Sequence, residues 1–240
     1  PYITGIVAGA FILASLVKVF NVSEVQPLYR LSLLTALAYL LVAPMALVAH
    51  LGHPERFYEI LLTPQTSSAM AMFGFVYAWY LMAVLLLEVW FVHRTDLIDM
   101  AERSTGATRL FYRALSLFSK DKGERAVAFD HKALRVITIV GIPSAFLLHG
   151  YVGFIFGSVK ANPWWSSVLI PIVFLFSAIV SGVALVILLY MIMTPLTGGK
   201  ISMRCVDKAI DFLFYAVIVD FSLEMVDFIH RVYQSEEEIK

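Results

Sequence analysis

Residues 165–194 read WSSVLIPIVFLFSAIVSGVALVILLYMIMT, a stretch of 30 positions without a charged side chain. A helix crosses the hydrocarbon core of a bilayer with about 20 mostly apolar residues, so this stretch is long enough to span a membrane. With five further apolar stretches it gives six predicted membrane helices, at residues 2–20, 31–50, 68–93, 134–157, 165–194 and 206–229. The sequence therefore predicts an all-α fold, a polytopic bundle that makes residues 1–240 a single integral membrane domain.

The composition leads to the same class of protein. Hydrophobic residues make up 60% of the chain and charged residues 15%, with a mean hydropathy of +0.81. A soluble domain has about 45–50% apolar and about 25% charged residues. These values exclude an ordinary soluble enzyme, a disordered chain and a nucleic-acid-binding protein. A single cysteine, Cys205, cannot supply a Cys-rich zinc or iron–sulfur ligand set. We therefore expect any redox chemistry to use a bound cofactor or a partner subunit.

Lysine and arginine lie mainly on one side of the predicted membrane. Alternating crossings place 14 of the 18 on that side, including all nine between Arg94 and Arg135. The positive-inside rule assigns this side to the cytoplasm. We thus predict a multi-pass protein of the cell (inner) membrane, with residue 1 and the loop 51–66 outside and the long loop 94–133 in the cytoplasm. Part of that loop is either an amphipathic helix on the membrane surface or a solvated loop.

Polar side chains within the apolar stretches gather at one depth, the outer third of the bundle. Ionisable groups are costly in a membrane and usually face a cavity or the bundle interior. Reduction of a quinone takes up two electrons and two protons, and His or Tyr side chains can orient the ring and supply protons. The candidate quinone-binding residues are Tyr2, His50, His149 and Tyr151. Gly150 and Gly153 are expected to leave room for a flat ring beside the backbone.

Three acids in the last apolar stretch share one helical face. Asp220, Glu224 and Asp227 recur at i, i+4 and i+7 near the predicted outer surface. They could form a proton route, a hydrated exit or a contact with a partner. Glu88 and His93, at the opposite end of the third stretch, are interpreted as interfacial residues.

Small residues four positions apart predict close contacts between helices. The pairs are Gly5 and Gly9, Gly153 and Gly157, and Ser177 and Ser181.

Three segments carry a resemblance to a known family. The segment LGHPERF at 51–57 follows the second apolar stretch directly, and HGYVG at 149–153 is followed by NPWW at 162–165 and an apolar helix at 167–189. The segment TGIVAGAF lies at 4–11. On these segments the chain resembles the NrfD/PsrC family, the integral membrane subunits of polysulfide reductase and related respiratory complexes. The type with a long charged loop is most similar to the subunits of the Dsr and Hmc complexes.

The resemblance implies a helical bundle without haem that binds quinone or quinol (menaquinone or ubiquinone) near the outer face. It also implies a ferredoxin-like iron–sulfur subunit docked on the outer, periplasmic face. The implied partner-contact loop consists of Gly52, His53, Pro54, Glu55 and Arg56. His53 stands where the family commonly has Arg. The family often has eight or ten membrane helices, so the chain is either a fragment of a longer protein or lacks two of them.

These observations predict a quinone-interacting membrane subunit of a respiratory oxidoreductase complex, in sulfur-compound or related metabolism. We expect no metal, haem or iron–sulfur cluster in this chain, and further redox subunits that include a cytoplasmic one. Two alternatives stay open. A cytochrome b-type subunit would use His50 and His149 as haem ligands on facing helices. A secondary transporter would use the buried acids, although the two halves of the sequence show no internal repeat.

Overall fold

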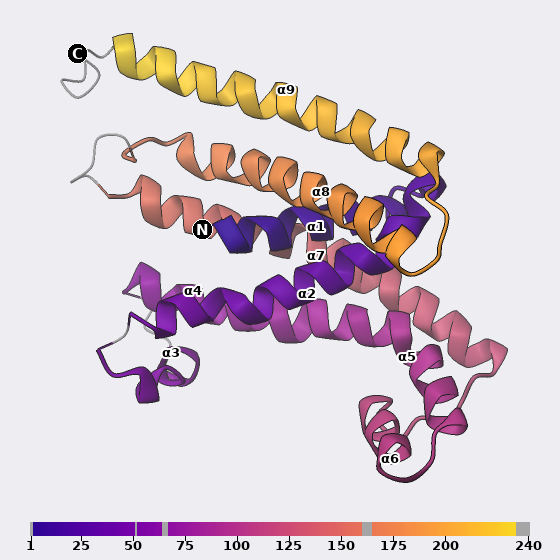
Figure 1. Cartoon of the computed structure of the whole chain (residues 1–240). Coiled ribbons are helices and arrows are strands. Elements are labelled where there is room, and N and C mark those ends of the chain that lie inside the picture. The colour runs from indigo at the N-terminus through magenta and orange to yellow at the C-terminus, as the bar shows by residue number, and fades with distance from the viewer. Residues whose placement is uncertain (1, 51, 64–66, 160–164, 234–240) are drawn as a thin grey trace.

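Each predicted membrane stretch is helical in the computed structural model, which describes residues 2–50, 52–63, 67–159 and 165–233 (Figure 1). The long helices are α1 (Tyr2–Lys18), α2 (Gln26–Val48), α4 (Ala69–Trp79), α5 (Leu86–Arg103), α7 (Glu124–Gly157), α8 (Ile170–Leu196) and α9 (Met203–Tyr233). A π-helical segment, η3 (Tyr80–Leu85), joins α4 and α5 into one rod. The shorter elements are η1 (Ser23–Val25), η2 (Pro54–Arg56), α3 (Glu59–Leu62) and α6 (Gly106–Leu115). The described residues contain no strand, and the predicted all-α bundle is confirmed.

Four rods are long and apolar enough to cross a membrane by length and composition. They cover Ser23–Met45, Met72–Arg103, Glu124–Gly157 and Ile170–Leu196. The other two predicted crossings, α1 and α9, do not meet these criteria, one because of its length and the other because of its charged side chains. Helix α1 is apolar but has 17 residues, whereas α9 has 31 residues and carries eight charged side chains. The chain is therefore a multi-pass membrane protein with four clear crossings.

The connections alternate between the two ends of the bundle. In Figure 1 the α1–α2, α5–α7 and α8–α9 connections lie at one end. The start of α1, the α3 segment, the start of α8 and the end of α9 lie at the other end. We call the first the Lys18 end and the second the Tyr2 end, after the two ends of α1.

Helix α1 lies at the centre of the bundle, against α2, α7 and α8. Of its 17 residues, 13 are buried. Its contact with α8 depends on the absence of side chains: a Cβ on Gly9 would lie 2.9 Å from the Gly182 Cα, and a Cβ on Gly182 would lie 2.6 Å from the Gly9 Cα. Small residues thus let the two backbones touch, as the spacing of Gly5 and Gly9 predicts.

A second close contact joins α7 to the beginning of α8. A Cβ on Gly153 would lie 2.7 Å from the Pro171 Cα, and one on Gly157 would lie 3.0 Å from the Ser167 carbonyl oxygen. The second predicted pair of small residues therefore also marks a helix contact.

Helices extend into the long polar segment between the third and fourth crossings. Helix α5 continues to Arg103 and α7 begins at Glu124, so the connection outside these two helices is shorter than the range 94–133. Helix α6 lies between them and exposes Leu110, Phe111 and Leu115. Its place on a membrane surface stays a prediction.

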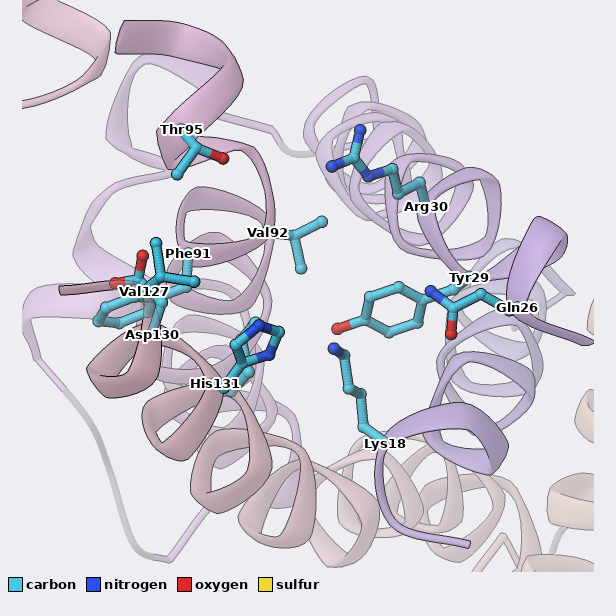
Figure 2. A pocket seen from close by; sticks show the side chains of 11 residues that line it. Lys18, Gln26, Tyr29, Arg30, Phe91, Val92, Thr95, Val127, Asp130 and His131 are labelled. Carbon is cyan, nitrogen blue, oxygen red and sulfur yellow. The ribbon is translucent and has the colours of Figure 1, made fainter. Parts of the chain in front are cut away.

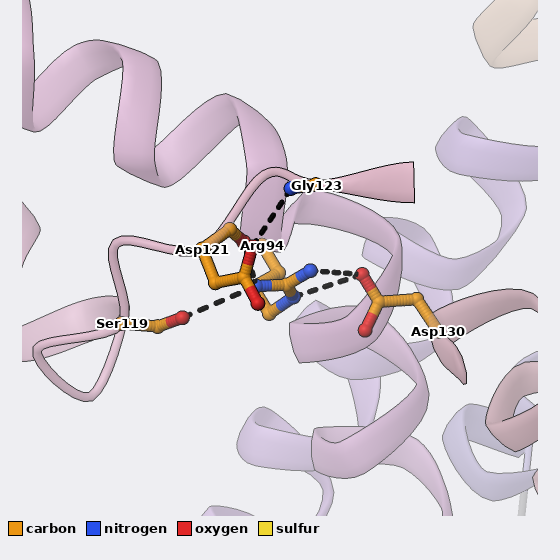
Figure 3. Close-up of polar contacts among 5 residues, drawn as sticks. All are labelled: Arg94, Ser119, Asp121, Gly123 and Asp130. Atoms are coloured by element: carbon orange, nitrogen blue, oxygen red, sulfur yellow. Dashed lines mark hydrogen bonds and ion pairs between the residues drawn. The ribbon is translucent and has the colours of Figure 1, made fainter. Parts of the chain in front are cut away.

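A buried ion pair fastens this segment to the bundle (Figure 3). The Arg94 guanidinium donates from Nε (2.8 Å) and Nη2 (2.6 Å) to Oδ2 of Asp130, and both side chains are almost fully buried. Its Nη1 donates to the Ser119 hydroxyl at 3.1 Å and to the Asp121 carbonyl oxygen at 2.7 Å. One guanidinium therefore joins α5, α7 and the turn between α6 and α7.

An exposed lysine adds a further link. Lys122 donates hydrogen bonds to Asp99 and Glu102 on α5, each at 2.7 Å. These hydrogen bonds raise the pKa of the Lys122 ammonium.

We predict that Gly9→Ala separates α1 from α8, because the added methyl would collide with the Ala178 carbonyl oxygen. Overpacking of this kind typically costs about 1–3 kcal/mol. The measurement is the midpoint of thermal unfolding of the purified protein in detergent, which should fall. Gly150→Ala is the matched control, because a Cβ there meets nothing within 4 Å. An unchanged midpoint in Gly9→Ala would contradict the close α1–α8 contact.

We also predict that Arg94→Met and Asp130→Leu each destabilise the protein by about 3–5 kcal/mol, because each leaves one buried charge without its partner. The double variant removes both charges and should recover most of the loss. Limited proteolysis of residues 104–123, together with thermal unfolding, measures the effect. Arg109→Met, at an exposed position of α6, is the control. A loss in the double variant equal to the sum of the two single losses would show that the two charges do not stabilise each other.

Candidate functional site

A pocket opens between α1, α7 and α8 near the Tyr2 end of the bundle. Its volume is about 170 Å³. The pocket is lined by Tyr2, Gly5, His149, Phe174, Ser177, Ala178 and Ser181. Ser177 and Ser181, the third predicted pair of small residues, thus line a cavity, and the Ser181 hydroxyl donates to the Ala178 carbonyl oxygen at 3.2 Å. The pocket combines one aromatic face with several hydrogen-bonding side chains.

His149 is the buried polar group of this pocket, with 4% of its surface exposed. Its Nδ1 lies 3.4 Å from the Thr4 hydroxyl oxygen, and its ring stacks on Phe174 with 5.9 Å between the ring centroids. Gly5 makes room for the imidazole, since a Cβ there would lie 3.1 Å from its Cε1. A neutral imidazole has one donor and one acceptor nitrogen, and the Phe174 backbone also hydrogen-bonds this ring, so a ligand oxygen would share or replace one of these two partners.

The predicted quinone-binding residues do not all meet in this pocket. Tyr2 and His149 line it together, whereas Tyr151 lies beyond it and stacks on Phe73 of α4 with 6.4 Å between centroids. His50 follows the end of α2, is exposed, and is not part of the lining. The room expected at Gly153 is already filled by Pro171, so that expectation is wrong. The free space lies on the α1 side of His149.

The three acids of α9 have different surroundings. Asp227 is buried, accepts a hydrogen bond from Arg231 Nε at 2.7 Å and is bonded to the Ser167 hydroxyl. It therefore ties α9 to the segment that leads into α8. Asp220 is half-buried and Glu224 is exposed. None of the three lines the His149 pocket.

The predicted partner-contact loop lies exposed at the Tyr2 end. Residues Gly52 to Arg56 are all exposed, and Pro54–Arg56 forms η2. His53 Nδ1 lies 3.0 Å from Glu55 Oε1, and Arg56 Nε donates to Glu59 Oε1 at 2.8 Å. Asn162, on the other predicted outer loop, lies outside the described residues. The described loop is available to a partner.

A second polar cluster lies toward the Lys18 end, around Glu88. This side chain is fully buried, although the sequence suggests an interfacial residue. Its Oε1 accepts hydrogen bonds from Thr138 Oγ1 at 2.8 Å and from the Tyr29 hydroxyl at 3.3 Å. The only signal in the sequence is a carboxylate within an apolar stretch, because nothing there pairs it with residues 50 and 59 positions away.

A pocket of about 240 Å³ lies beside this cluster. It is lined by Lys18, Gln26, Tyr29, Arg30, Phe91, Val92, Thr95, Val127, Asp130, His131 and Leu134. Figure 2 shows the Lys18 ammonium and the Tyr29 hydroxyl converging within it, with His131 facing them. Tyr29 therefore contacts both this pocket and Glu88.

Comparison with known proteins places this architecture among integral membrane subunits. The model of the family described as "Polysulphide reductase, NrfD" matches residues 1–231. The chain belongs to the NrfD family, and the family resemblance of its sequence is confirmed.

Three curated relatives illustrate the family. A selenate reductase subunit of Mesobacillus selenatarsenatis is 37% identical over 194 residues, 79% of this chain and 45% of the relative. A putative dimethyl sulfoxide reductase membrane subunit of Halobacterium salinarum is 27% identical over 76% of this chain and 39% of its own length. Protein NrfD of Escherichia coli is 27% identical over 78% of this chain and 56% of its own length. The chain spans about half the length of these relatives.

Proposed function

We propose that this chain is the quinone-interacting membrane subunit of a respiratory reductase complex, and that the His149 pocket holds the quinone headgroup. The observation that carries the proposal is the placement of Tyr2, His149, Ser177 and Ser181 around one cavity. Two of the relatives are named as subunits of selenate and dimethyl sulfoxide reductases, which supports a role in a reductase complex.

The size and lining of the pocket suit a single flat ring. An engineered apolar cavity of about 150 Å³ in another protein binds benzene, and this pocket measures about 170 Å³. Phe174 already stacks on the imidazole, and a quinone ring could lie against the same aromatic surface. His149 would hydrogen-bond one quinone oxygen, and Tyr2 or a serine hydroxyl would serve the other.

Protons and electrons follow separate routes in this proposal. A bound quinone supplies the two-electron chemistry, while His149 orients it and can hold or release a proton at a ring nitrogen. Asp220 and Glu224 would pass protons to the outer solution; Asp227 is engaged by Arg231 and Ser167. A ferredoxin-like iron–sulfur subunit at the exposed loop Gly52 to Arg56 would exchange electrons with the quinone.

The haem alternative is less well supported by the geometry. It needs His50 and His149 as a pair around one cofactor. The lining of the His149 pocket contains no second histidine, and His50 is exposed at the end of α2. Quinone binding requires one imidazole together with hydroxyl groups, which the pocket has.

We predict that His149→Ala and Gly5→Ala each weaken binding of a fluorescent quinol analogue to the reconstituted protein. The first removes a hydrogen bond to the ring, worth about 0.5–1.5 kcal/mol, or up to roughly tenfold in affinity. The second keeps the imidazole but pushes a methyl to 3.1 Å from its Cε1, which displaces the ring and narrows the pocket.

Two matched variants serve as controls. Gly150→Ala adds the same methyl next to His149, where it meets nothing within 4 Å, and should bind the analogue normally. Tyr151→Phe tests the neighbouring face of α7 and should weaken analogue binding less than His149→Ala or Gly5→Ala does. If Tyr151→Phe weakens binding and Gly5→Ala does not, the headgroup lies between α4 and α7 instead.

We further predict that the Tyr2 end of the bundle faces the outside. In a Cys205→Ser background, a cysteine at Ser158, which is exposed at the Tyr2 end, should react with an impermeant thiol reagent in intact cells. A cysteine at Lys120, exposed at the Lys18 end, should react only after permeabilisation. The opposite pattern would reverse the membrane orientation and place the proposed quinone pocket on the cytoplasmic side.

A further inference from the structure

The most heavily buried carboxylate of the described chain lies outside the proposed quinone site. Glu88 has no exposed surface, and burial of an isolated charge is costly unless partners compensate it. Its four neighbours with polar or charged groups come from four elements. They are Lys18 of α1, Tyr29 of α2, Tyr80 of η3 and Thr138 of α7.

The two oxygens of this carboxylate have different environments. Oε1 accepts both hydroxyl donors, whereas Oε2 is buried and has no hydrogen-bond partner among the described residues. A proton taken up by Glu88 would therefore reside on Oε2 or displace a donor from Oε1. The nearby Tyr80 hydroxyl is likewise buried without a hydrogen-bond partner in the described chain.

The geometry at Thr138 fits both protonation states of Glu88. The Thr138 hydroxyl lies 2.8 Å from Glu88 Oε1 and 2.7 Å from the Leu134 carbonyl oxygen. A hydroxyl has one hydrogen and can also accept. With Glu88 ionised, Thr138 donates to the carboxylate. With Glu88 protonated, Thr138 donates to Leu134 and can accept from the acid, so no heavy atom has to move.

Tyr29 connects this carboxyl group to the pocket at the Lys18 end. Its hydroxyl is bonded to Glu88, and its side chain lines the cavity of about 240 Å³ (Figure 2). The Lys18 ammonium lies 5.0 Å from the centroid of the Tyr29 ring. Lys18 makes no hydrogen bond or ion pair within the described residues, so its charge is available to balance an ionised Glu88.

The other charged groups at the pocket are already paired. Arg30 Nη1 lies 2.7 Å from Asp96 Oδ2, and Asp130 is held by Arg94. His131 remains as a titratable group that faces the cavity. Lys18 and Glu88 are therefore the charged pair at this site, and protonation of Glu88 leaves the Lys18 charge without its counter-charge.

We propose that Glu88 is a proton-accepting site that exchanges with the solution at the Lys18 end of the bundle, through the Tyr29 hydroxyl. In the uptake step Tyr29 passes its hydroxyl proton to the Glu88 carboxylate and receives one from a hydronium ion in the pocket, which is left as water. The tyrosine ends unchanged and the carboxylate becomes a carboxylic acid. The site is separate from the His149 pocket, and the proposal does not depend on quinone binding there.

The test uses dicyclohexylcarbodiimide, an apolar reagent that modifies protonated carboxyl groups. The full-length protein is examined in sealed membrane vesicles of both orientations, and a cysteine at Lys120 reports which face is the Lys18 end. Mass spectrometry should locate the modification on Glu88. Labelling should fall as the pH at the Lys18 end rises, because the carboxylate loses its proton. It should not respond to the pH at the Tyr2 end.

Variants separate the proposed roles. Glu88→Gln should abolish labelling while leaving binding of the quinol analogue unchanged. Tyr29→Phe keeps the ring but removes the hydroxyl, and should slow the response of labelling to a pH jump roughly tenfold or more. Tyr39→Phe, on the same helix but outside the cluster, is the control. If Glu88→Gln does not fold, the comparison of Tyr29→Phe with Tyr39→Phe still tests whether protons reach Glu88 through the Tyr29 hydroxyl.

Three outcomes would overturn the proposal. The first is that Glu88 is not modified at any pH in the folded protein. The second is that its labelling follows the pH at the Tyr2 end. The third is that its labelling responds equally fast in Tyr29→Phe. Loss of analogue binding in His149→Ala with Glu88 labelling unchanged would separate this site from the proposed quinone function.

Discussion

The contact between Gly9 and Gly182 is the constraint on which the rest of the structure depends. In lipid, apolar helices gain little from hiding apolar surface, and association relies on close packing. Two glycines facing each other let α1 sit directly on the α8 backbone. This brings α1 to the centre of the bundle, where it also meets α2 and α7. From that position its two ends form walls of both polar pockets, Tyr2 and Gly5 at one end and Lys18 at the other.

Large apolar side chains fill part of the bundle between the two pockets. Phe11 of α1 meets Tyr80 of η3 edge to face at 5.6 Å, and both are fully buried. Leu148, next to His149, is also fully buried. A ligand in the His149 pocket and a proton at Glu88 therefore occupy separate environments. Any influence of one on the other would have to pass through these packed side chains.

The sequence is sufficient to predict the helices, two of the three small-residue contacts and the family, because each rests on spacing along one chain. The sequence does not predict which side chains of different helices meet. His149 and Tyr151 are two positions apart and face different neighbours, Phe174 and Phe73. Glu88 follows the π-helical residues 80–85, which shift the helical phase, so a uniform period does not predict its burial. The charged residues at 94–103 suggest a loop from the sequence, but in the structure they form the last part of α5.

The Arg94–Asp130 pair has a consequence for how the protein is made. The two residues are 36 positions apart on different helices, so the ribosome delivers the guanidinium well before the carboxylate. Until α7 arrives, Arg94 has to be solvated by water or lipid phosphates, because an uncompensated charge is poorly tolerated in apolar surroundings. The smallest unit in which these charges are satisfied is the α5–α7 hairpin. Integration into the bilayer should therefore be completed for the two helices together.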